Sequence, residues 1–213
     1  MPTIAHACSL DVVCVSTDGQ QLLVLVRRAR RGGTELPWAP LEPACQMEAA
    51  ASGLARSVLD RAPSFVTQLG AYGDGAAHGS GRPLSVAFLA IAPSDDAVPV
   101  GAEWRLIDAR LALPARQRTM LADARAQLSE GASVVISPIA FRLLPPAFTL
   151  SELQRVHELL LGRSIHTAGF RRSLAATGLV EPLDEWRSVG RGRPAQLHVY
   201  APASGHIKNS KRL

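Results

Sequence analysis

The stretch FTLSELQRVHELLLGRSIHTAGFRRSLAATGLV, residues 148–180, decides the fold of the C-terminal third of this chain. Thr149 stands before a helical run and Glu152 follows three residues later, which is the pattern of a capping box. Apolar residues then recur at helical spacing as far as Gly162, which is expected to end this helix. Thr167 is expected to cap a second short helix that Gly178 ends. The stretch therefore predicts two short helices joined by a tight turn.

Two short strands are expected after these helices, formed by Leu179-Val180 and Leu197–Tyr200. The segment between them is polar and contains the string Gly190-Arg191-Gly192-Arg193-Pro194. Two helices followed by a basic hairpin are the layout of a winged helix-turn-helix. Leu144-Pro145-Pro146 is expected to be a stiff connector, because each proline fixes its own φ and disfavours helix in the residue before it. The prediction is a winged helix at 148–202 and a flexible basic tail at 203–213.

The charge of the chain supports this division. The 213 residues carry a formal net charge of +5. Residues 1–143 hold 13 Arg and 13 Asp or Glu, whereas residues 144–213 hold 10 Lys or Arg and 5 Asp or Glu. The basic excess therefore lies in the last third, which favours an anion-binding module joined to a neutral domain. A solvated basic face is the alternative interpretation of the same charges.

Residues 1–143 are predicted to form one mixed α/β domain. Residues 9–15 and 21–28 are predicted to form a hairpin around Thr17-Asp18-Gly19, and 30–43 a loop without regular structure. Further strands are expected at 65–72, 84–92 and 102–107, and helices at 45–60 and 116–128. The buried face of the first helix is assigned to Met47, Ala50, Leu54 and Val58, with Ala51 as a further candidate.

The order of strand, Leu36-Pro37, loop, amphipathic helix and strand resembles the Nudix hydrolase fold. That family holds divalent metal against a diphosphate with glutamates of the box Gly-x5-Glu-x7-Arg-Glu-U-x-Glu-Glu, where U is apolar. Counting on from Leu36-Pro37 places Ala39 at the glycine, Cys45 at the first glutamate, and Leu54, Ser57 and Val58 at the remaining glutamates. Because these side chains supply no carboxylate, we expect no catalytic residue, no metal site and no enzyme activity.

The C-terminal motifs extend the resemblance to nearly the whole chain. In order and spacing, 148–154, 161–163, 170–172, 178–182 and 190–195 resemble the winged helix of the Nudix-related transcriptional regulators, the NrtR family. Upstream, 70–74, Arg82 and 138–144 fit the same pattern. The resemblance implies a dimeric repressor of NAD-metabolism genes. Its Nudix-like domain would bind ADP-ribose or a related nucleotide as an effector, without a cofactor. Some relatives control sugar genes instead.

Arginines carry the expected contacts to double-stranded DNA. Arg163, Arg171 and Arg172 bracket the second helix, and Arg191 and Arg193 lie in the hairpin, where guanidinium groups can reach phosphates or guanine edges. Thr167 completes the predicted DNA-binding set. A homodimer on a palindromic operator is expected, because one small winged helix makes few base contacts.

The predicted ligand-binding set is Arg28, Trp38, Tyr72, Asp74 and Arg82, which could stack on a nucleotide or pair with it; core packing explains the two aromatics nearly as well. His157 is expected at the surface and the three cysteines as free thiols of a cytoplasmic protein without a membrane segment. Two other functions stay open: a diphosphate hydrolase with an appended module, and a DNA-binding protein whose Nudix-like half only dimerises.

Overall fold

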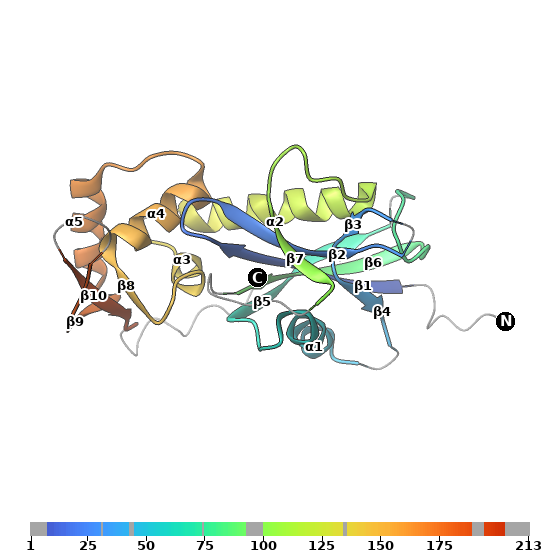
Figure 1. Ribbon diagram of the computed structural model, residues 1–213, viewed down its shortest axis with the longest axis horizontal. Helices are drawn as coiled ribbons and strands as arrows, with labels where there is room; N and C mark the ends of the chain where they lie inside the picture. The colour runs from blue at the N-terminus through green and yellow to red at the C-terminus, as the bar shows by residue number, and fades with distance from the viewer. Residues whose placement is uncertain are drawn as a thin grey trace. The chain divides into compact units, whose positions relative to one another are not determined.

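The computed structural model describes residues 8–30, 32–42, 45–73, 75–92, 100–133, 136–188 and 194–202. The chain forms two compact units, Met1–Leu128 and Ser129–Leu213 (Figure 1). Within the described residues, no helix is long and apolar enough to cross a lipid bilayer. Each unit has its own sheet and its own helices.

The first unit is built on a seven-stranded sheet of order β3-β2-β1-β6-β5, with β4 added to β1 and β7 added to β2. Its strands are β1 (Cys8–Thr17), β2 (Leu22–Arg28), β3 (Thr34–Glu35), β4 (Trp38–Pro40), β5 (Phe65–Tyr72), β6 (Leu84–Ile91) and β7 (Ala102–Leu106). β1 and β6 run parallel, and the other pairs are antiparallel. The predicted β1–β2 hairpin is confirmed, and Gly19 in its turn has φ 83°.

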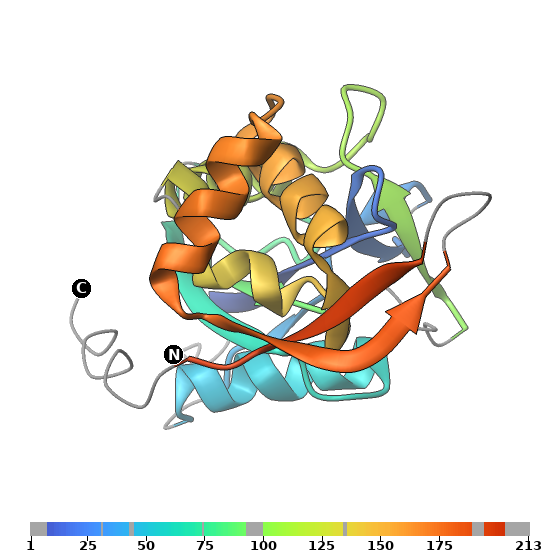
Figure 2. The ribbon, with the colours of Figure 1, turned by 90° about the vertical axis from the view of Figure 1, so that its left-hand side faces the viewer.

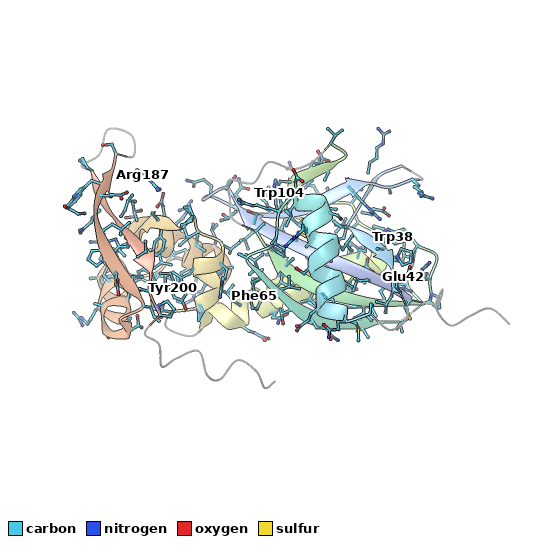
Figure 3. The ribbon with its side chains drawn as sticks, turned by 90° about the horizontal axis from the view of Figure 1, so that it is seen from below. Trp38, Glu42, Phe65, Trp104, Arg187 and Tyr200 are labelled. Carbon is cyan, nitrogen blue, oxygen red and sulfur yellow. The ribbon has the colours of Figure 1, made fainter. Side chains whose placement is uncertain are left out.

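Helices cover both faces of this sheet (Figure 1). α1 (Met47–Leu59) packs on the face that carries Leu10, Val12 and Cys14 of β1, as Figure 3 shows from that side. α2 (Ala115–Ser133) buries Met120, Leu121, Ala124 and Leu128, the stripe expected from its sequence. Because β1 and β6 are buried on both faces, their sequences are nearly continuous apolar runs rather than alternating ones.

The second unit combines α3 (Pro138–Arg142), α4 (Leu150–Leu161) and α5 (Thr167–Thr177) with an antiparallel sheet of order β8-β10-β9. The strands are β8 (Ala147–Thr149), β9 (Val180–Arg187) and β10 (Ala195–Tyr200). Figure 2 shows α4 and α5 beside the long β9–β10 hairpin. The predicted capping box of α4 is confirmed, since Glu152 N donates to Thr149 Oγ1 and Thr149 N to Glu152 Oε2. Gly162 and Gly178 end the two helices in left-handed conformations.

Several local expectations were wrong. The segment 30–43 was expected to lack regular structure, but it contains the short strands β3 and β4. The β4 strand tolerates Pro40 because this residue lies at the end of an edge strand, where the ladder requires no N–H donor. For α1 the expected face is right except for Met47, which is 43% exposed. Ala50, Leu54 and Val58 pack against the core, and the most deeply buried residues of the helix are Ala51, Ala55 and Leu59.

The second unit also differs from its sequence pattern in two places. The strand expected at Leu179-Val180 continues to Arg187, because its polar residues lie on an edge strand that bulges opposite Gln196 and His198. His166, not Thr167, caps α5: its Nδ1 accepts the N–H of Gly169. The capping acceptor is therefore an imidazole nitrogen and not the Thr167 hydroxyl that the sequence suggested.

The boundary between the units falls earlier than the 143–148 predicted from the prolines. The cause is an aromatic cluster. Phe141 of α3 stacks on Tyr200 of β10 with ring centroids 4.2 Å apart, and Phe148 lies 5.7 Å from Phe141. Phe141 and Phe148 are buried, so α3 is part of the winged-helix core. The division therefore lies within α2, after Leu128.

Candidate functional site

α5 has one buried face and one exposed basic face. Phe170 and Leu174 are only 4% and 1% exposed and stand one turn apart, so they fix this helix in the core of the second unit. Arg171 and Arg172 are exposed on the remaining surface of the helix. Arg163 is exposed in the turn before α5. Arg171 and Arg172 are therefore exposed to solvent on α5, and Arg163 is exposed in the turn before it.

The turn between α4 and α5 is held by a set of hydrogen bonds that the sequence did not reveal. Gln154 Nε2 lies 3.1 Å from Glu158 Oε1, 3.1 Å from the Ile165 carbonyl and 3.2 Å from Thr167 Oγ1. Glu158 Oε1 also accepts the N–H of Ile165 at 2.9 Å. This backbone bond and the bond from Gln154 lower the pKa of Glu158. The Gln154–Glu158 pair at i, i+4 is the available sequence signal for such a lock.

His157 packs inside the helix pair rather than at the surface. Its side chain is 1% exposed and lies edge-on to the Phe170 ring, with centroids 5.4 Å apart. Burial lowers the pKa of His157 to about 4, so the imidazole is neutral at pH 7. The surface expectation failed because His157 falls on the buried face with Leu153, Val156 and Leu160.

An ion pair joins the hairpin to the start of α4. Arg187 lies on β9 (Figure 3). Its Nη1 donates to Glu152 Oε1 at 3.0 Å, and its Nη2 donates to the Ala147 carbonyl at 3.0 Å. Glu152 therefore bonds both to the N-cap of α4 and to β9 of the hairpin, and these contacts fix the hairpin against the start of α4. Arg191 and Arg193 follow β9 in the sequence and lie outside the described residues.

The first unit contains a buried polar cluster on the sheet face opposite α1. Asp11 of β1 is fully buried, and its Oδ1 lies 2.7 Å from His78 Nε2 and 3.0 Å from Gln117 Nε2. Ser9 donates to Asp11 Oδ2 at 2.9 Å. His78 comes from the glycine-rich loop and Gln117 from α2, so one carboxylate fastens both to the sheet. The sequence signal that could have revealed this cluster is the presence of the polar residues Ser9 and Asp11 within the apolar run of β1.

Trp38 and its surroundings are the best-supported part of the predicted ligand set. Arg27 lies over the Trp38 ring, 5.2 Å from the centroid, and donates from Nε to Glu35 at 3.0 Å. Within the described part of the chain, the buried Nε1 of Trp38 has no hydrogen-bond partner. The buried Nε of Arg82 is likewise unpartnered among those residues. Buried donors without a hydrogen-bond partner are uncommon, and they indicate positions where an acceptor can bind.

The other predicted ligand residues lie elsewhere. Tyr72 stands on β5, and β4 and β5 flank the β1–β6 pair on opposite sides, so Tyr72 and Trp38 are separated by two strands. The Tyr72 hydroxyl donates to Asp123 at 2.8 Å, and burial, together with this bond, raises the pKa of Tyr72. Arg28 lines a separate cavity of about 430 Å³ with Gly33, Thr34, Gly101, Ala102 and Glu103. Asp74 lies outside the described residues.

α1 holds three of the four positions at which the Nudix resemblance would require glutamates. Leu54 and Val58 pack against the apolar core, and the Ser57 hydroxyl donates to the Leu54 carbonyl at 2.8 Å. Glu48 is exposed in the first turn. Among the described residues, no group of three or more His, Cys, Asp or Glu side chains is placed to hold a metal ion.

Comparison with known proteins connects these features to a family. Residues 140–200 match the model of the NrtR DNA-binding winged helix domain. The chain is 36% identical over 101 residues to the ADPR responsive transcriptional repressor NtrR of Acinetobacter baylyi. This alignment covers 46% of the chain and 39% of that relative's length.

Solved structures show the same architecture. NrtR of Shewanella oneidensis, crystallised with a 27mer DNA, matches with a TM-score of 0.79 and 25% identity, over 92% of this chain and 94% of that one. The NUDIX domain of the same protein, complexed with ADP ribose, matches 57% of this chain and 87% of its own length, with a TM-score of 0.50 and 19% identity. Residues 140–200 are therefore a winged-helix domain of the NrtR DNA-binding type, and the chain has the fold of NrtR, a Nudix-like domain followed by that winged helix.

Proposed function

We propose that this chain is a transcriptional repressor that binds duplex DNA through its second unit and a nucleotide effector through its first. The exposed face of α5, with Arg171 and Arg172 opposite the buried Phe170 and Leu174, carries this proposal. A rigid helix that presents guanidinium groups to solvent is suited to the major groove. The DNA complex of the Shewanella protein and the name of the Acinetobacter relative support the assignment.

A mobility-shift assay tests the DNA-binding part. The full chain is incubated with its own upstream region and with a scrambled duplex of equal length, at several salt concentrations. We expect tighter binding to the upstream region, as a specific site requires. Equal binding to both duplexes at every salt concentration would contradict a sequence-specific repressor.

ADP-ribose or a related nucleotide is the proposed effector, and genes of NAD metabolism are the proposed targets. The name of the Acinetobacter relative and the ADP-ribose complex of the Shewanella domain support this choice. Trp38 and Arg82 are the proposed contacts, because each has a buried donor without a partner among the described residues. Arg28, Tyr72 and Asp74 belong to the same proposal on the sequence alone. Calorimetry with ADP-ribose, NAD and sugar phosphates identifies the effector, and a sugar phosphate that binds alone would favour the sugar-responsive alternative.

The first unit is proposed to bind without hydrolysis. Leu54, Ser57 and Val58 stand where Nudix hydrolases carry glutamates, and their side chains give a divalent ion no carboxylate oxygen. We expect no release of AMP when the protein is incubated with ADP-ribose and Mg²⁺ or Mn²⁺. Turnover at ordinary enzymic rates, about 1 per second or faster, would restore the hydrolase interpretation.

A homodimer on a palindromic operator completes the proposal. One winged helix reaches few base pairs, so two half-sites about one helical turn or a multiple apart are needed for useful specificity. Light scattering of the DNA complex tests the stoichiometry, and one chain per operator would contradict it.

A further inference from the structure

β9 carries the carboxylates of the second unit that no described cation neutralises. Glu181, Asp184 and Glu185, called here the β9 carboxylates, are all exposed, and none of them forms an ion pair with another described residue. Glu152 and Glu158, the other acidic side chains in the last third of the chain, accept hydrogen bonds from backbone N–H groups. Unpaired carboxylates on one strand attract cations and repel the phosphates of DNA. This strand is therefore suited to a basic partner.

An exposed tryptophan follows the carboxylates on the same strand. Trp186 is 59% exposed, although tryptophan side chains are on average highly buried in folded proteins. Trp38 and Trp104 lie in the first unit, so Trp186 is the one tryptophan of the second unit. Because exposed aromatic side chains are enriched where another segment covers the surface, Trp186 adds an apolar contact to the charges of β9.

The outer edge of β9 is not a regular template for a further strand. Among the described strands, the order β8-β10-β9 leaves β9 at the end of the sheet. Pro182 lies opposite His198 and Trp186 lies opposite Gln196, so this stretch of β9 is two residues longer than the stretch of β10 that it faces. A bulge and a proline on an edge strand discourage the addition of another strand. A partner of β9 is therefore recognised by side chains and not by backbone pairing.

The basic tail (203–213) follows directly on this sheet and lies outside the described residues. β10 ends opposite Val180, and Ala201 donates its N–H to the Leu179 carbonyl at 2.9 Å. The chain therefore leaves the sheet beside the first residues of β9. The seven residues between β10 and Lys208 can span about 23 Å, which exceeds the roughly 10 Å of two strand spacings. The tail is thus long enough to reach the outer side of β9.

The cations of the tail have the same spacing as the β9 carboxylates. Lys208, Lys211 and Arg212 follow one another at intervals of three residues and one residue, and so do the three carboxylates. A tail that runs along β9 in the same direction brings each cation beside one carboxylate. In that alignment Leu213 reaches Trp186. Charge and apolar character therefore match along the whole stretch.

We propose that the basic tail docks on β9 of its own chain, with its three cations against the β9 carboxylates and Leu213 against Trp186. Exposed ion pairs are individually weak, but the tail is tethered beside β9 at an effective concentration in the millimolar range, so weak pairs are sufficient. The docked tail neutralises a strand of the second unit that would otherwise repel an anion. This interaction requires neither DNA nor a nucleotide, so it does not depend on the proposed function.

Acrylamide quenching of Trp186 fluorescence tests the docking in the absence of DNA. The full chain is compared with a chain that stops after residue 202. Each is measured beside its Trp186→Phe variant, whose signal is subtracted to leave that of Trp186 alone. The titrations are run at about 0.02 M NaCl and at about 1 M NaCl, where the Debye length falls to about 3 Å.

At low salt we expect the quenching constant of Trp186 to be about two-fold lower in the full chain than in the shortened chain, because three exposed ion pairs hold the tail for only part of the time. The difference should disappear at the higher salt concentration, which screens exposed charges. Equal quenching of the two chains at low salt would overturn the inference.

Charge reversal in the full chain identifies the partners. The tail variant combines Lys208→Glu, Lys211→Glu and Arg212→Glu. The compensating β9 variant combines Glu181→Lys, Asp184→Lys and Glu185→Lys. The matched control reverses the same number of exposed cations elsewhere in the second unit and combines Arg163→Glu, Arg171→Glu and Arg172→Glu.

The tail variant should lose the protection of Trp186, because like charges then face each other. The tail and β9 variants combined in one chain should regain it, and the matched control should keep it. Protection that survives reversal of the tail alone would overturn the charge pairing. Protection that increases with protein concentration would overturn docking within one chain, because it would place the tail on a second copy.

Discussion

Arg171 and Arg172 are neighbours in sequence and both are exposed, because the helical repeat gives only Phe170 and Leu174 to the core. Their guanidinium groups extend from α5, and the buried side chains of Phe170 and Leu174 fix this helix in the core of the second unit. Such cations can make bidentate contacts with guanine, which depend on position. Arg191 and Arg193 alternate with glycines in the sequence Gly190-Arg191-Gly192-Arg193, a pattern better suited to contact with phosphates or the minor groove.

The two arginine pairs should therefore behave differently. Arg171→Ala or Arg172→Ala should cost about 1–3 kcal/mol on the operator and little on a scrambled duplex. Arg191→Ala and Arg193→Ala should weaken both, each lowering the salt slope by about one unit. Titration of the four variants at several salt concentrations distinguishes the roles. If none of them changes affinity, the basic third of the chain binds something other than DNA.

Asp11 is the residue on which the polar cluster of the first unit depends. Asp11→Ala removes the acceptor of Ser9, His78 and Gln117, so three buried polar groups lose a partner. We expect a loss of about 3–5 kcal/mol in unfolding free energy, as for a broken buried polar pair. Urea unfolding measures it. Asp18→Ala, in the exposed β1–β2 turn, is the control and should cost much less. Equal losses would show that the cluster adds no particular stability.

At the scale of elements, α4 and α5 are held in a fixed relative orientation by contacts on the polar and the apolar side of the turn between them. Gln154 and Glu158 hold the backbone of Ile165 from the α4 side. His157 and Phe170 close the apolar side. The orientation of the exposed face of α5 is thereby set by residues other than the arginines on that face.

Acid should loosen this helix pair. The folded-state pKa of His157, about 4, lies below the ordinary 6.5, so the unfolded chain binds more protons between these values. Stability is therefore complete above pH 6.5 and falls as pH drops towards 4, by about 2–4 kcal/mol for this residue. His157→Leu should show a smaller loss than wild type between pH 7 and pH 4.5 in urea titrations. Identical pH profiles would mean that His157 accepts a proton without unfolding.

At the scale of the whole molecule, the winged helix extends beyond the connector that its prolines suggest. α3 contributes Phe141, which stacks on Tyr200, and Ala140, which is fully buried. The segment before Pro145-Pro146 thus belongs to the core of the second unit and not to a linker.

This arrangement predicts where the chain can be divided. A fragment of residues 136–202 should unfold cooperatively, whereas a fragment of residues 148–202, lacking α3, should lose the Phe141 contacts and unfold several degrees lower or not fold at all. Circular dichroism melting of the two fragments measures this. Equal melting temperatures would show that α3 adds no stability and that the domain boundary lies at Pro145-Pro146.

The sequence by itself determined the local elements of this protein. The capping box at Thr149, the glycines that end α4 and α5, and the apolar runs of β1 and β6 are short-range patterns. Their spacing predicts the helices and strands because hydrogen-bond capping and burial act within a few residues. The resemblance to the NrtR winged helix also rests on such contiguous motifs, and the comparisons confirm it.

Only the tertiary structure decided how these elements meet. His157 is buried because of the helix that packs against it, and Met47 is exposed because the sheet meets α1 one position further on. Asp11, His78 and Gln117 come from distant segments, so no spacing in the sequence announces their contact. Trp38 and Tyr72 were grouped by residue type, yet the strand order separates them. Burial and partnership depend on which surfaces pack together, and a one-dimensional pattern does not contain that information.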